Sequence, residues 1–331
     1  MSRNATHSRR APIVVVPAVL ALLVLSACSD PAGAAAGNLV AKVGNRTYDL
    51  SATQTHITAK KNDAVAAELP ADVRDSGVLV IGSGSAGGGI PPLAFTADDN
   101  KTPIGVEIDV AHLIASILGL KPKVETTSWE NLFLGLDSGK FNVGISNIGV
   151  SELRKQKYDF ATYRLGLHAF EARKGSGLKV SGPADISGKT VAVASGTLQE
   201  AILLRWNQEN IAAGRPPAEL KYYQQATAYY LALQSGRVQL YLGPNPVAAY
   251  HVATAKQTEI VGTVSSSFPI TGLVAVTTKK GNGLVKPLAD ALNVAIGDGS
   301  YAKVLAKWGL QGEAVTKSEV NPPGLPNTPT K

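Results

Sequence analysis

The sequence predicts an α/β protein built from two successive sets of alternating strands and helices. Short aliphatic runs typical of strands recur between longer segments whose apolar residues fall at helical spacing. With 44% hydrophobic and only 17% charged residues among 331, the chain is expected to fold and to be long enough for two ordinary domains.

The first set of elements precedes the middle of the chain. Apolar residues at helical spacing from Val110 to Leu118, followed by Gly119, predict a helix and its end. A strand is expected on either side of it. The elements predicted in this set are strands at Val78–Ile81, Lys123–Thr127 and Val143–Ser146 and helices at 110–118 and Glu130–Leu136. Such alternation favours parallel strands covered by helices.

The second set repeats the same alternation. Its predicted strands are Thr190–Ala194, Leu220–Tyr223 and Val238–Leu242, and its helices are Leu198–Asn210, Tyr229–Gln234 and Val247–Ala255. A last strand at Gly272–Thr278 and helices at Leu284–Ile296 and Tyr301–Trp308 complete the pattern. The chain is therefore expected to form two α/β units.

Residues 1–28 are typical of a bacterial lipoprotein signal peptide, with basic residues before a short apolar stretch. The stretch ends in Leu25-Ser26-Ala27-Cys28, which resembles a lipobox and implies a lipid anchor at Cys28 on the outer face of the cell membrane. An ordinary secretory signal is the alternative. Cys28 is the single cysteine of the chain, which excludes disulfides and a thiol nucleophile in the mature body.

Both ends of the folded region are expected to lack regular structure. Residues 29–71 are rich in Ala, Gly, Thr and Asn with little periodicity and predict a flexible tether, whereas residues 311–331 form a Pro-rich, irregular tail. Removal of three N-terminal arginines lowers the formal charge from +7 to +4, since 29 basic and 25 acidic residues remain. This small, dispersed surplus does not suggest a nucleic-acid partner.

Seven segments between residues 72 and 309 match a known family pattern in order and spacing. They are GVLVIG, IPPLAF, GVEIDVAHLIASILGL, SWENLFLGLDSGKFNVGISNIGVSELRKQKYDF, ISGKTVAVASGT, ALQSGRVQLYLGPNPVAAY and DGSYAKVLAKWG. In these segments the sequence resembles bacterial extracellular solute-binding proteins of family 3, which serve ABC importers of polar amino acids. The resemblance implies a type II periplasmic-binding-protein fold, with two open sheets flanked by helices and joined by two crossover strands. Lobe 1 would comprise residues 72–167 plus 271–310, and lobe 2 residues 168–270.

The resemblance also implies a function. A substrate-binding lipoprotein of this kind captures a small polar ligand, an amino acid or related carboxylate, by closing its cleft, and delivers it to an ABC permease and its ATPase. We expect a monomer without a cofactor. The alternative is an enzyme on the same fold, similar to cyclohexadienyl dehydratase, for which Glu107 is the candidate acid or base.

The family pattern assigns ligand contacts to positions in both lobes. Arg154 matches an arginine that pairs with the ligand's carboxylate, which suits a guanidinium fork. The aromatic side chains of Trp129 and Phe95 would form two walls, although either could belong to the core instead. The remaining expected contacts are Asn147, Gly149, Ser195, Gly196, Thr197 and Asn245.

Two positions depart from the family pattern. Relatives commonly carry an Asp at the positions aligned with Gly84 and Pro244, where it neutralises the ligand's ammonium. Because a buried ammonium without a carboxylate is costly, either Glu107 or another acid substitutes, or the ligand lacks a free α-ammonium.

Three further patterns point to no additional function. Gly82–Gly87 spells G-x-G-x-x-G after a predicted strand, but the Gly-Gly-Gly-Ile-Pro-Pro that follows cannot begin the helix a dinucleotide site requires, so we predict a flexible cleft loop. The five histidines show no metal-ligand spacing, so no metal site is expected. Tyr222, Tyr223, Tyr229 and Tyr230 form a cluster for which packing is the favoured use.

Overall fold

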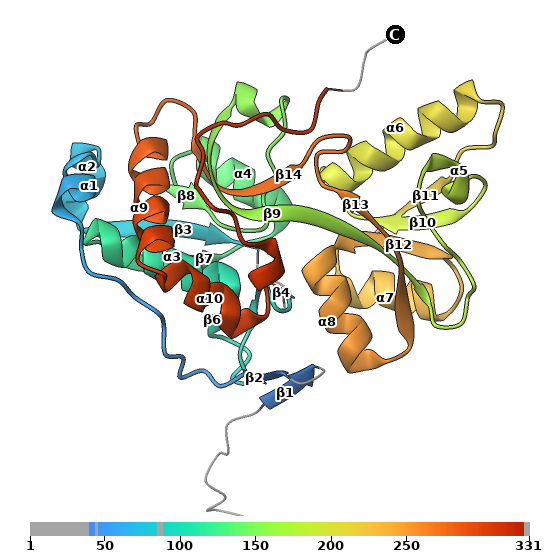
Figure 1. Cartoon of the computed structure of the whole chain (residues 1–331), viewed down its shortest axis with the longest axis horizontal. Helices are drawn as coiled ribbons and strands as arrows, with labels where there is room; N and C mark the ends of the chain where they lie inside the picture. Colours follow the sequence, from blue (N-terminus) through green and yellow to red (C-terminus); the bar gives the residue numbers. More distant parts are fainter. Residues whose placement is uncertain (1–39, 44–45, 85–88, 328–331) are drawn as a thin grey trace, which may run out of the picture. The chain divides into compact units, whose positions relative to one another are not determined.

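The computed structural model describes residues 40–43, 46–84 and 89–327 (Figure 1). The predicted signal peptide, its Cys28 and residues 29–39 of the predicted tether lie outside the described residues. So do residues 85–88, which hold part of the G-x-G-x-x-G segment and of the predicted cleft loop.

All of the strands and helices predicted between residues 78 and 308 are present, with bounds shifted by a few residues. The strands are β1 Val40–Val43, β2 Arg46–Asp49, β3 Val78–Ser83, β4 Gly89–Ile90, β5 Ala94–Thr96, β6 Pro103–Ile104, β7 Lys121–Thr126, β8 Val143–Gly144, β9 Tyr158–Arg173, β10 Thr190–Val193, β11 Glu219–Tyr222, β12 Leu240–Pro244, β13 Thr258–Ser265 and β14 Gly272–Lys279. The helices are α1 Asp63–Ala67, α2 Ala71–Ser76, α3 Val106–Leu118, α4 Trp129–Asp137, α5 Pro183–Ile186, α6 Leu198–Ala212, α7 Ala226–Gln234, α8 Asn245–Ala255, α9 Val285–Gly297 and α10 Ser300–Trp308, with 3-10 turns η2 Arg154–Gln156 and η3 Gln311–Glu313.

The long strand β9 belongs to two halves of one large sheet. In the described part of the chain the strand order is β11-β10-β12-β9-β14-β8-β3-β7, and β13 also pairs with β9. β9 pairs with β14 up to Gly166 and with β13 from Leu167 onward. The α/β class with a two-part, helix-flanked sheet is thereby confirmed, and we propose the lobe boundary at this change of partner.

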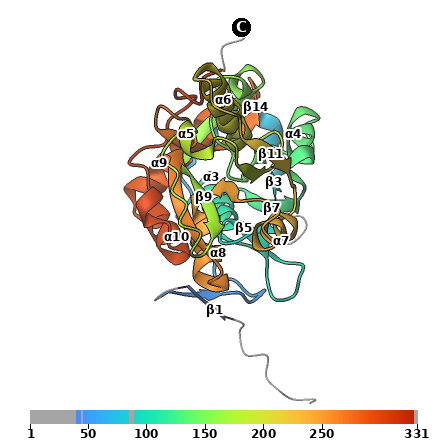
Figure 2. The ribbon, with the colours of Figure 1, turned by 90° about the vertical axis from the view of Figure 1, so that its right-hand side faces the viewer.

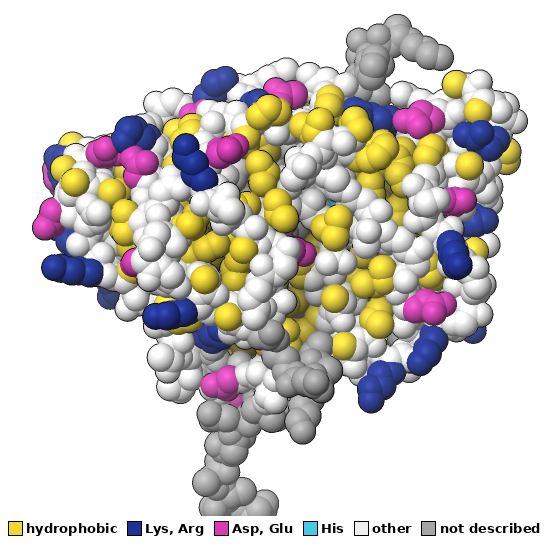
Figure 3. Space-filling view, viewed as in Figure 1, with side chains coloured by type: hydrophobic (Ala, Val, Ile, Leu, Met, Phe, Trp, Pro, Cys, Tyr) yellow, Lys and Arg dark blue, Asp and Glu magenta, His cyan; other side chains and the backbone are white. Residues whose placement is uncertain are grey.

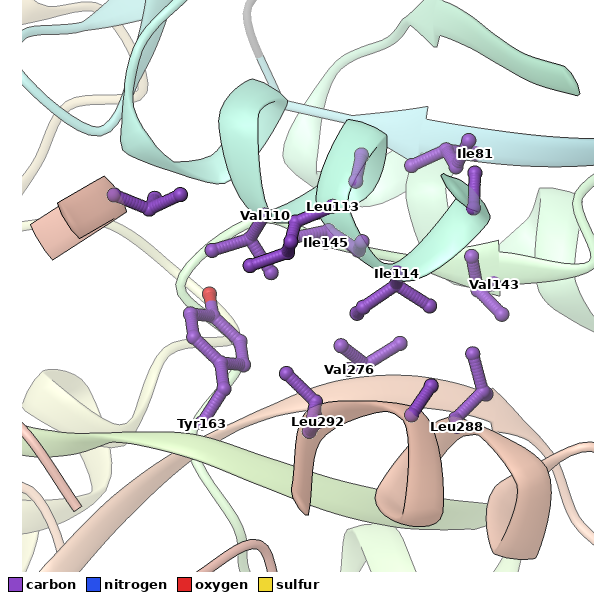
Figure 4. Close-up of a cluster of buried hydrophobic side chains, with 14 of the residues drawn as sticks. Ile81, Val110, Leu113, Ile114, Val143, Ile145, Tyr163, Val276, Leu288 and Leu292 are labelled. Atoms are coloured by element: carbon purple, nitrogen blue, oxygen red, sulfur yellow. The ribbon is translucent and has the colours of Figure 1, made fainter. Parts of the chain in front are cut away.

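Helices cover both faces of the half that contains β3. The turned view shows α9 and α10 on one flank and α4 on the other (Figure 2). Helix α3 is buried almost all round because it packs between the sheet and helix α9. Ile114 of α3 faces Val276 of β14 and Leu288 of α9 within this core (Figure 4).

The other half has a separate core. Phe170 of β9 stacks on Trp206 of α6, with ring centroids 5.5 Å apart, and aliphatic side chains of β10 and β12 surround the pair.

On the face of the molecule shown in Figure 3, hydrophobic side chains gather over the middle while Lys and Arg lie mainly around the edge.

The prediction of a flexible tether over residues 29–71 is wrong for the part that the structure describes, residues 40–43 and 46–71, which forms strands β1 and β2 and helices α1 and α2. Tyr48, Val65 and Leu69 are buried in the same core cluster as helix α3. Asn62 caps α1 by accepting hydrogen bonds from two backbone N–H groups of the first turn. Helices of five and six residues are too short to produce a clear apolar period, so the sequence did not reveal them.

The C-terminal segment has little regular structure, but it is bound along the molecule. Asn321 accepts a hydrogen bond from the backbone of Phe160 at 2.9 Å and donates one to Asp159. Farther on, Arg205 of α6 donates to the Pro326 carbonyl at 2.9 Å. The segment therefore contacts residues of both proposed lobes.

We predict that Leu69→Ala lowers the free energy of unfolding by about 2–5 kcal/mol, because it leaves a cavity in the core. Leu69 is 3% exposed, whereas Leu134 is 63% exposed and serves as the matched control. Leu134→Ala should change stability by no more than about 0.5 kcal/mol. Urea unfolding measures both values, and equal small effects would contradict the assignment of residues 46–71 to the folded body.

Candidate functional site

A cavity lies where the two halves of the sheet meet. The residues that follow β3, β8 and β10 line it, together with the C-terminal end of β12, the first turns of α4, α6 and α7 and the middle of β9. The carboxyl ends of strands in open α/β sheets are the usual position of a ligand site. The cavity volume is about 160 Å³, far above the roughly 10–15 Å³ that holds one water molecule.

Most of the predicted ligand contacts are brought together here. Those that line the cavity are Trp129, Asn147, Gly149, Arg154 and Thr197. Thr197 caps α6, because its hydroxyl accepts a hydrogen bond from the Glu200 N–H at 3.2 Å, and this fixes the turn that contains Ser195 and Gly196. Neither Ser195 nor Gly196 lines the cavity, but the Gly196 carbonyl bonds to a cavity residue.

Arg154 presents a half-buried guanidinium to this cavity. Its Nη1 donates to the Gly149 carbonyl at 2.9 Å and its Nη2 to the Gly196 carbonyl at 3.1 Å. The guanidinium carbon lies 5.2 Å from the ring centroid of Trp129, within the range of a cation–π contact. No carboxylate among the described residues forms an ion pair with it. Burial lowers the pKa of Arg154 to about 10, so the side chain remains a cation at neutral pH.

Phe95 and Asn245 do not line the cavity, and these two predictions need correction. Phe95 is buried in the core, where its ring meets Trp308 edge-on at 5.9 Å, because its position on β5 faces helix α10. Asn245 begins α8, and its amide donates to Glu313 at 3.4 Å beside a second cavity. The preceding residue, Pro244, occupies the position on the ligand cavity instead.

Glu107 also lies away from the cavity. It is 1% exposed, accepts a hydrogen bond from the Tyr163 hydroxyl and pairs with Arg164 at 3.4 Å. Burial raises the pKa of Glu107, and the charge of Arg164 opposes that rise. Arg164 also donates to Glu313 and to Asn147. Glu107 is therefore committed to a buried network and does not replace the missing ammonium partner.

The Ser146 side chain fills the space beside Gly84, the first of the two positions at which relatives commonly carry an Asp. The Gly84 N–H donates to the Ser146 hydroxyl at 3.0 Å, and a Cβ at position 84 would lie 2.3 Å from that oxygen. An acidic side chain therefore does not fit there without displacing Ser146. Among the described lining residues the only carboxylate is that of Glu130, which is exposed.

Several lining residues were not predicted from the sequence. Tyr229, predicted to pack, stacks on Tyr241 at 3.9 Å between ring centroids and lines the cavity as well. His168 lies on β9, and Ser266 directly follows the end of β13. His168 is 4% exposed, and burial together with the charges of Arg154 and Arg164 lowers its pKa to about 3. The imidazole is therefore neutral at physiological pH.

No group of three or more His, Cys, Asp or Glu side chains in the described part of the chain could hold a metal ion. A search of the same residues for a helix long and apolar enough to cross a membrane found none.

An α/β sheet in two parts, with a polar cavity at their junction, defines a protein that binds a small solute. The chain belongs to the bacterial extracellular solute-binding proteins, family 3, whose family model matches residues 81–311.

Curated relatives and solved structures agree with this assignment. The chain is 30% identical over 248 residues to the L-cystine-binding protein TcyJ of Escherichia coli (strain K12), an alignment that covers 74% of this chain and 86% of TcyJ. It is 26% identical to the L-cystine-binding protein TcyA of Bacillus subtilis (strain 168), with 78% and 90% covered. An ancestral arginine-binding protein bound to arginine superposes with a TM-score of 0.59 at 29% identity, with 70% and 98% covered.

Because His168 is neutral in the folded protein, we predict that the free energy of unfolding depends on pH. Its pKa is about 3 in the folded protein, against roughly 6.5 when unfolded, so below pH 6.5 the unfolded chain binds more protons than the folded one. The free energy of unfolding should therefore fall as the pH falls from about 6.5, by at most about 1.4 kcal/mol per pH unit from this residue.

Urea unfolding between pH 7 and pH 4 tests this, because His168→Phe removes the titrating group and should reduce the slope. Part of the slope should remain, since burial also lowers the pKa of His112, to about 4. Ser266→Ala, a change in the same cavity without a titrating group, is the control and should keep the wild-type slope. Equal slopes in the wild type and His168→Phe would contradict the placement of His168.

Proposed function

We propose that this chain is the substrate-binding protein of an ABC importer and that it captures an amino acid or a related carboxylate. The main support is Arg154, a guanidinium that lines the cavity without a carboxylate partner among the described residues. Relatives named for cystine and arginine binding support the same class of ligand. A planar guanidinium binds a carboxylate through two parallel hydrogen bonds.

Ligand capture would act through the two proposed lobes. Arg154 and Trp129 come from the first lobe and Thr197 from the second, so one molecule in the cavity contacts both. Helix α6 directs its first backbone N–H groups toward the cavity, a favourable position for a negatively charged oxygen. Contacts that form only when the lobes approach each other shift the population toward the closed form, which is the form that the permease and its ATPase would recognise.

We expect binding of a carboxylate to depend on Arg154. Arg154→Ala should weaken binding of whichever probe binds the wild type by about 10- to 100-fold, because it removes a charge-assisted pair. Arg154→Lys should restore part of the affinity, since an ammonium keeps the charge and loses the fork. Isothermal calorimetry with L-cystine, L-arginine and L-glutamine provides the measurement.

Arg74→Ala is the matched control, because Arg74 is an exposed cation outside the cavity lining that forms an ion pair with the neighbouring Asp75. Unchanged affinity in Arg154→Ala would refute the proposed role of Arg154. If none of the three amino acids binds the wild type, a wider panel of carboxylates decides the ligand class.

The proposed location is the outer face of the cell membrane, with a lipid on Cys28 and the protein acting as a monomer. The lipobox-like sequence before Cys28 and the family's extracellular members support it. Cys28→Ser should move the protein from the membrane fraction to the soluble exported fraction, because a mature chain without the thioether-linked lipid has no anchor. The measurement is fractionation of cells with immunoblotting; Ser29→Ala is the control, and membrane retention of Cys28→Ser would contradict the anchor.

The enzyme alternative receives no support from the cavity. It depended on Glu107 as acid or base, and Glu107 is bound to Tyr163 and Arg164 outside the cavity lining. Glu130 is the carboxylate among the described lining residues, and it is exposed, an environment that does not tune an acid for proton transfer.

A further inference from the structure

Buried polar side chains of the cavity that have no hydrogen-bond partner in the described part of the chain are those of His168, Ser266 and Tyr229; His168 and Ser266 lie next to each other in the wall formed by the strands. Both ring nitrogens of His168 and the hydroxyl of Ser266 are unpaired, although the residues are only 4% and 1% exposed. Both residues line the ligand cavity. A buried polar group without a partner costs about 1–3 kcal/mol, so such groups normally receive one.

The pairing of the strands brings these two side chains together. The Ser266 N–H donates to the Gly166 carbonyl, which places Ser266 opposite Gly166 on β9. His168 lies two residues further along β9, so it faces the same side of the sheet as Gly166. A Cβ on Gly166 would lie 2.2 Å from the Ser266 hydroxyl, so glycine at this position leaves that hydroxyl its space.

The chemistry of the pair matches a hydroxyl group. A neutral imidazole offers one N–H donor and one nitrogen acceptor, and a serine hydroxyl offers a donor and two acceptor lone pairs. A hydroxyl on the ligand can donate to one of these groups and accept from the other. An ammonium can only donate, so it can bond to the acceptor nitrogen of the imidazole but never to its N–H, whereas a hydroxyl can bond to either.

The surrounding charges oppose a second cation. The guanidinium groups of Arg154 and Arg164 both act electrostatically on the imidazole of His168. The carboxylates that pair with Arg164 belong to Glu107 and Glu313, which lie outside the cavity lining. His168 itself pairs across the sheet with Pro244, a residue that offers neither a charge nor an N–H. An ammonium beside His168 would therefore be buried close to positive charge without a carboxylate.

We propose that His168 and Ser266 bind an uncharged hydroxyl group next to the ligand's carboxylate, so that the cavity takes a 2-hydroxy acid in preference to the matching amino acid. The inference rests on the proposed function, because it uses Arg154 as the carboxylate partner. In this proposal His168 determines the specificity for a hydroxyl group, and Ser266 provides the second hydrogen bond to that hydroxyl.

Matched pairs of ligands test the inference by calorimetry on the purified chain. The probes are L-lactate with L-alanine, L-2-hydroxyglutarate with L-glutamate, and L-phenyllactate with L-phenylalanine. Within a pair the carbon skeleton and carboxylate are the same, and only hydroxyl and ammonium differ. In the pair whose skeleton fits, the hydroxy acid should bind the wild type at least about 10-fold more tightly, the discrimination of one well-placed hydrogen bond.

Variants of His168 give a readout that a merely structural role would not change. His168→Ala should reduce the preference for the hydroxy acid to about two-fold or less, and Ser266→Ala should reduce it partly. His168→Asp should reverse it, because the new carboxylate supplies the partner that an ammonium needs. His112→Ala, which alters a histidine outside the cavity lining, should leave the ratio of the two affinities unchanged.

The outcomes separate the two proposals. An amino acid that binds the wild type more tightly than its hydroxy acid, or a ratio that His168→Ala leaves unchanged, overturns the hydroxyl site while carboxylate binding stands. If no carboxylate of any pair, and none of the three amino acids tested with Arg154, binds the wild type, the proposed function fails and the hydroxyl site fails with it.

Discussion

The pairing of β9 with strands of both halves of the sheet is the constraint on which the rest of the structure depends. One continuous strand pairs with β14 up to Gly166 and with β13 from Leu167, so its middle is fixed from both sides. That middle is also part of the cavity wall. Because side chains alternate along a strand, a shift of one residue would turn His168 away from the cavity. The register of β9 thus sets both the junction of the halves and the chemistry of the site.

The buried guanidinium of Arg164 connects three parts of the chain beside the cavity. From β9 it reaches Glu107 on α3, Asn147 after β8 and Glu313 in the C-terminal segment, three parts of the chain far apart in sequence. The two carboxylates compensate its charge within the protein, and Asn147, which it holds, lines the cavity. The guanidinium of Arg154, by contrast, donates to two backbone carbonyls and to no carboxylate among the described residues. The two arginines therefore differ in role, because Arg164 has carboxylate partners within the protein and Arg154 leaves its charge for a ligand.

The sequence predicted the alternating strands and helices well, because a helix such as α3 carries a clear apolar period that tertiary contacts reinforce. It also predicted Arg154 and Trp129 at the cavity through a family pattern. It missed β9, whose buried residues include Arg164, His168 and Glu171, polar side chains that only tertiary partners or a ligand can satisfy. The prediction that Phe95 lines the cavity was wrong because an aromatic residue suits a cavity wall and a core equally. The sequence does not show the contact with Trp308 that places Phe95 in the core.

The buried polar groups that lack hydrogen-bond partners link the closure of the proposed lobes to the choice of ligand. At the cavity, the proposed lobes contact each other directly through the hydrogen bond from Arg154 to the Gly196 carbonyl. The unpaired atoms of His168 and Ser266 lie at the same junction, so a ligand that completes their hydrogen bonds contributes free energy that the protein alone does not have. A molecule that binds Arg154 but leaves these atoms unpaired gains less from closure. Since a ligand shifts a conformational equilibrium only by its difference in affinity for the two forms, the groups that choose the ligand are also those that drive the lobes together.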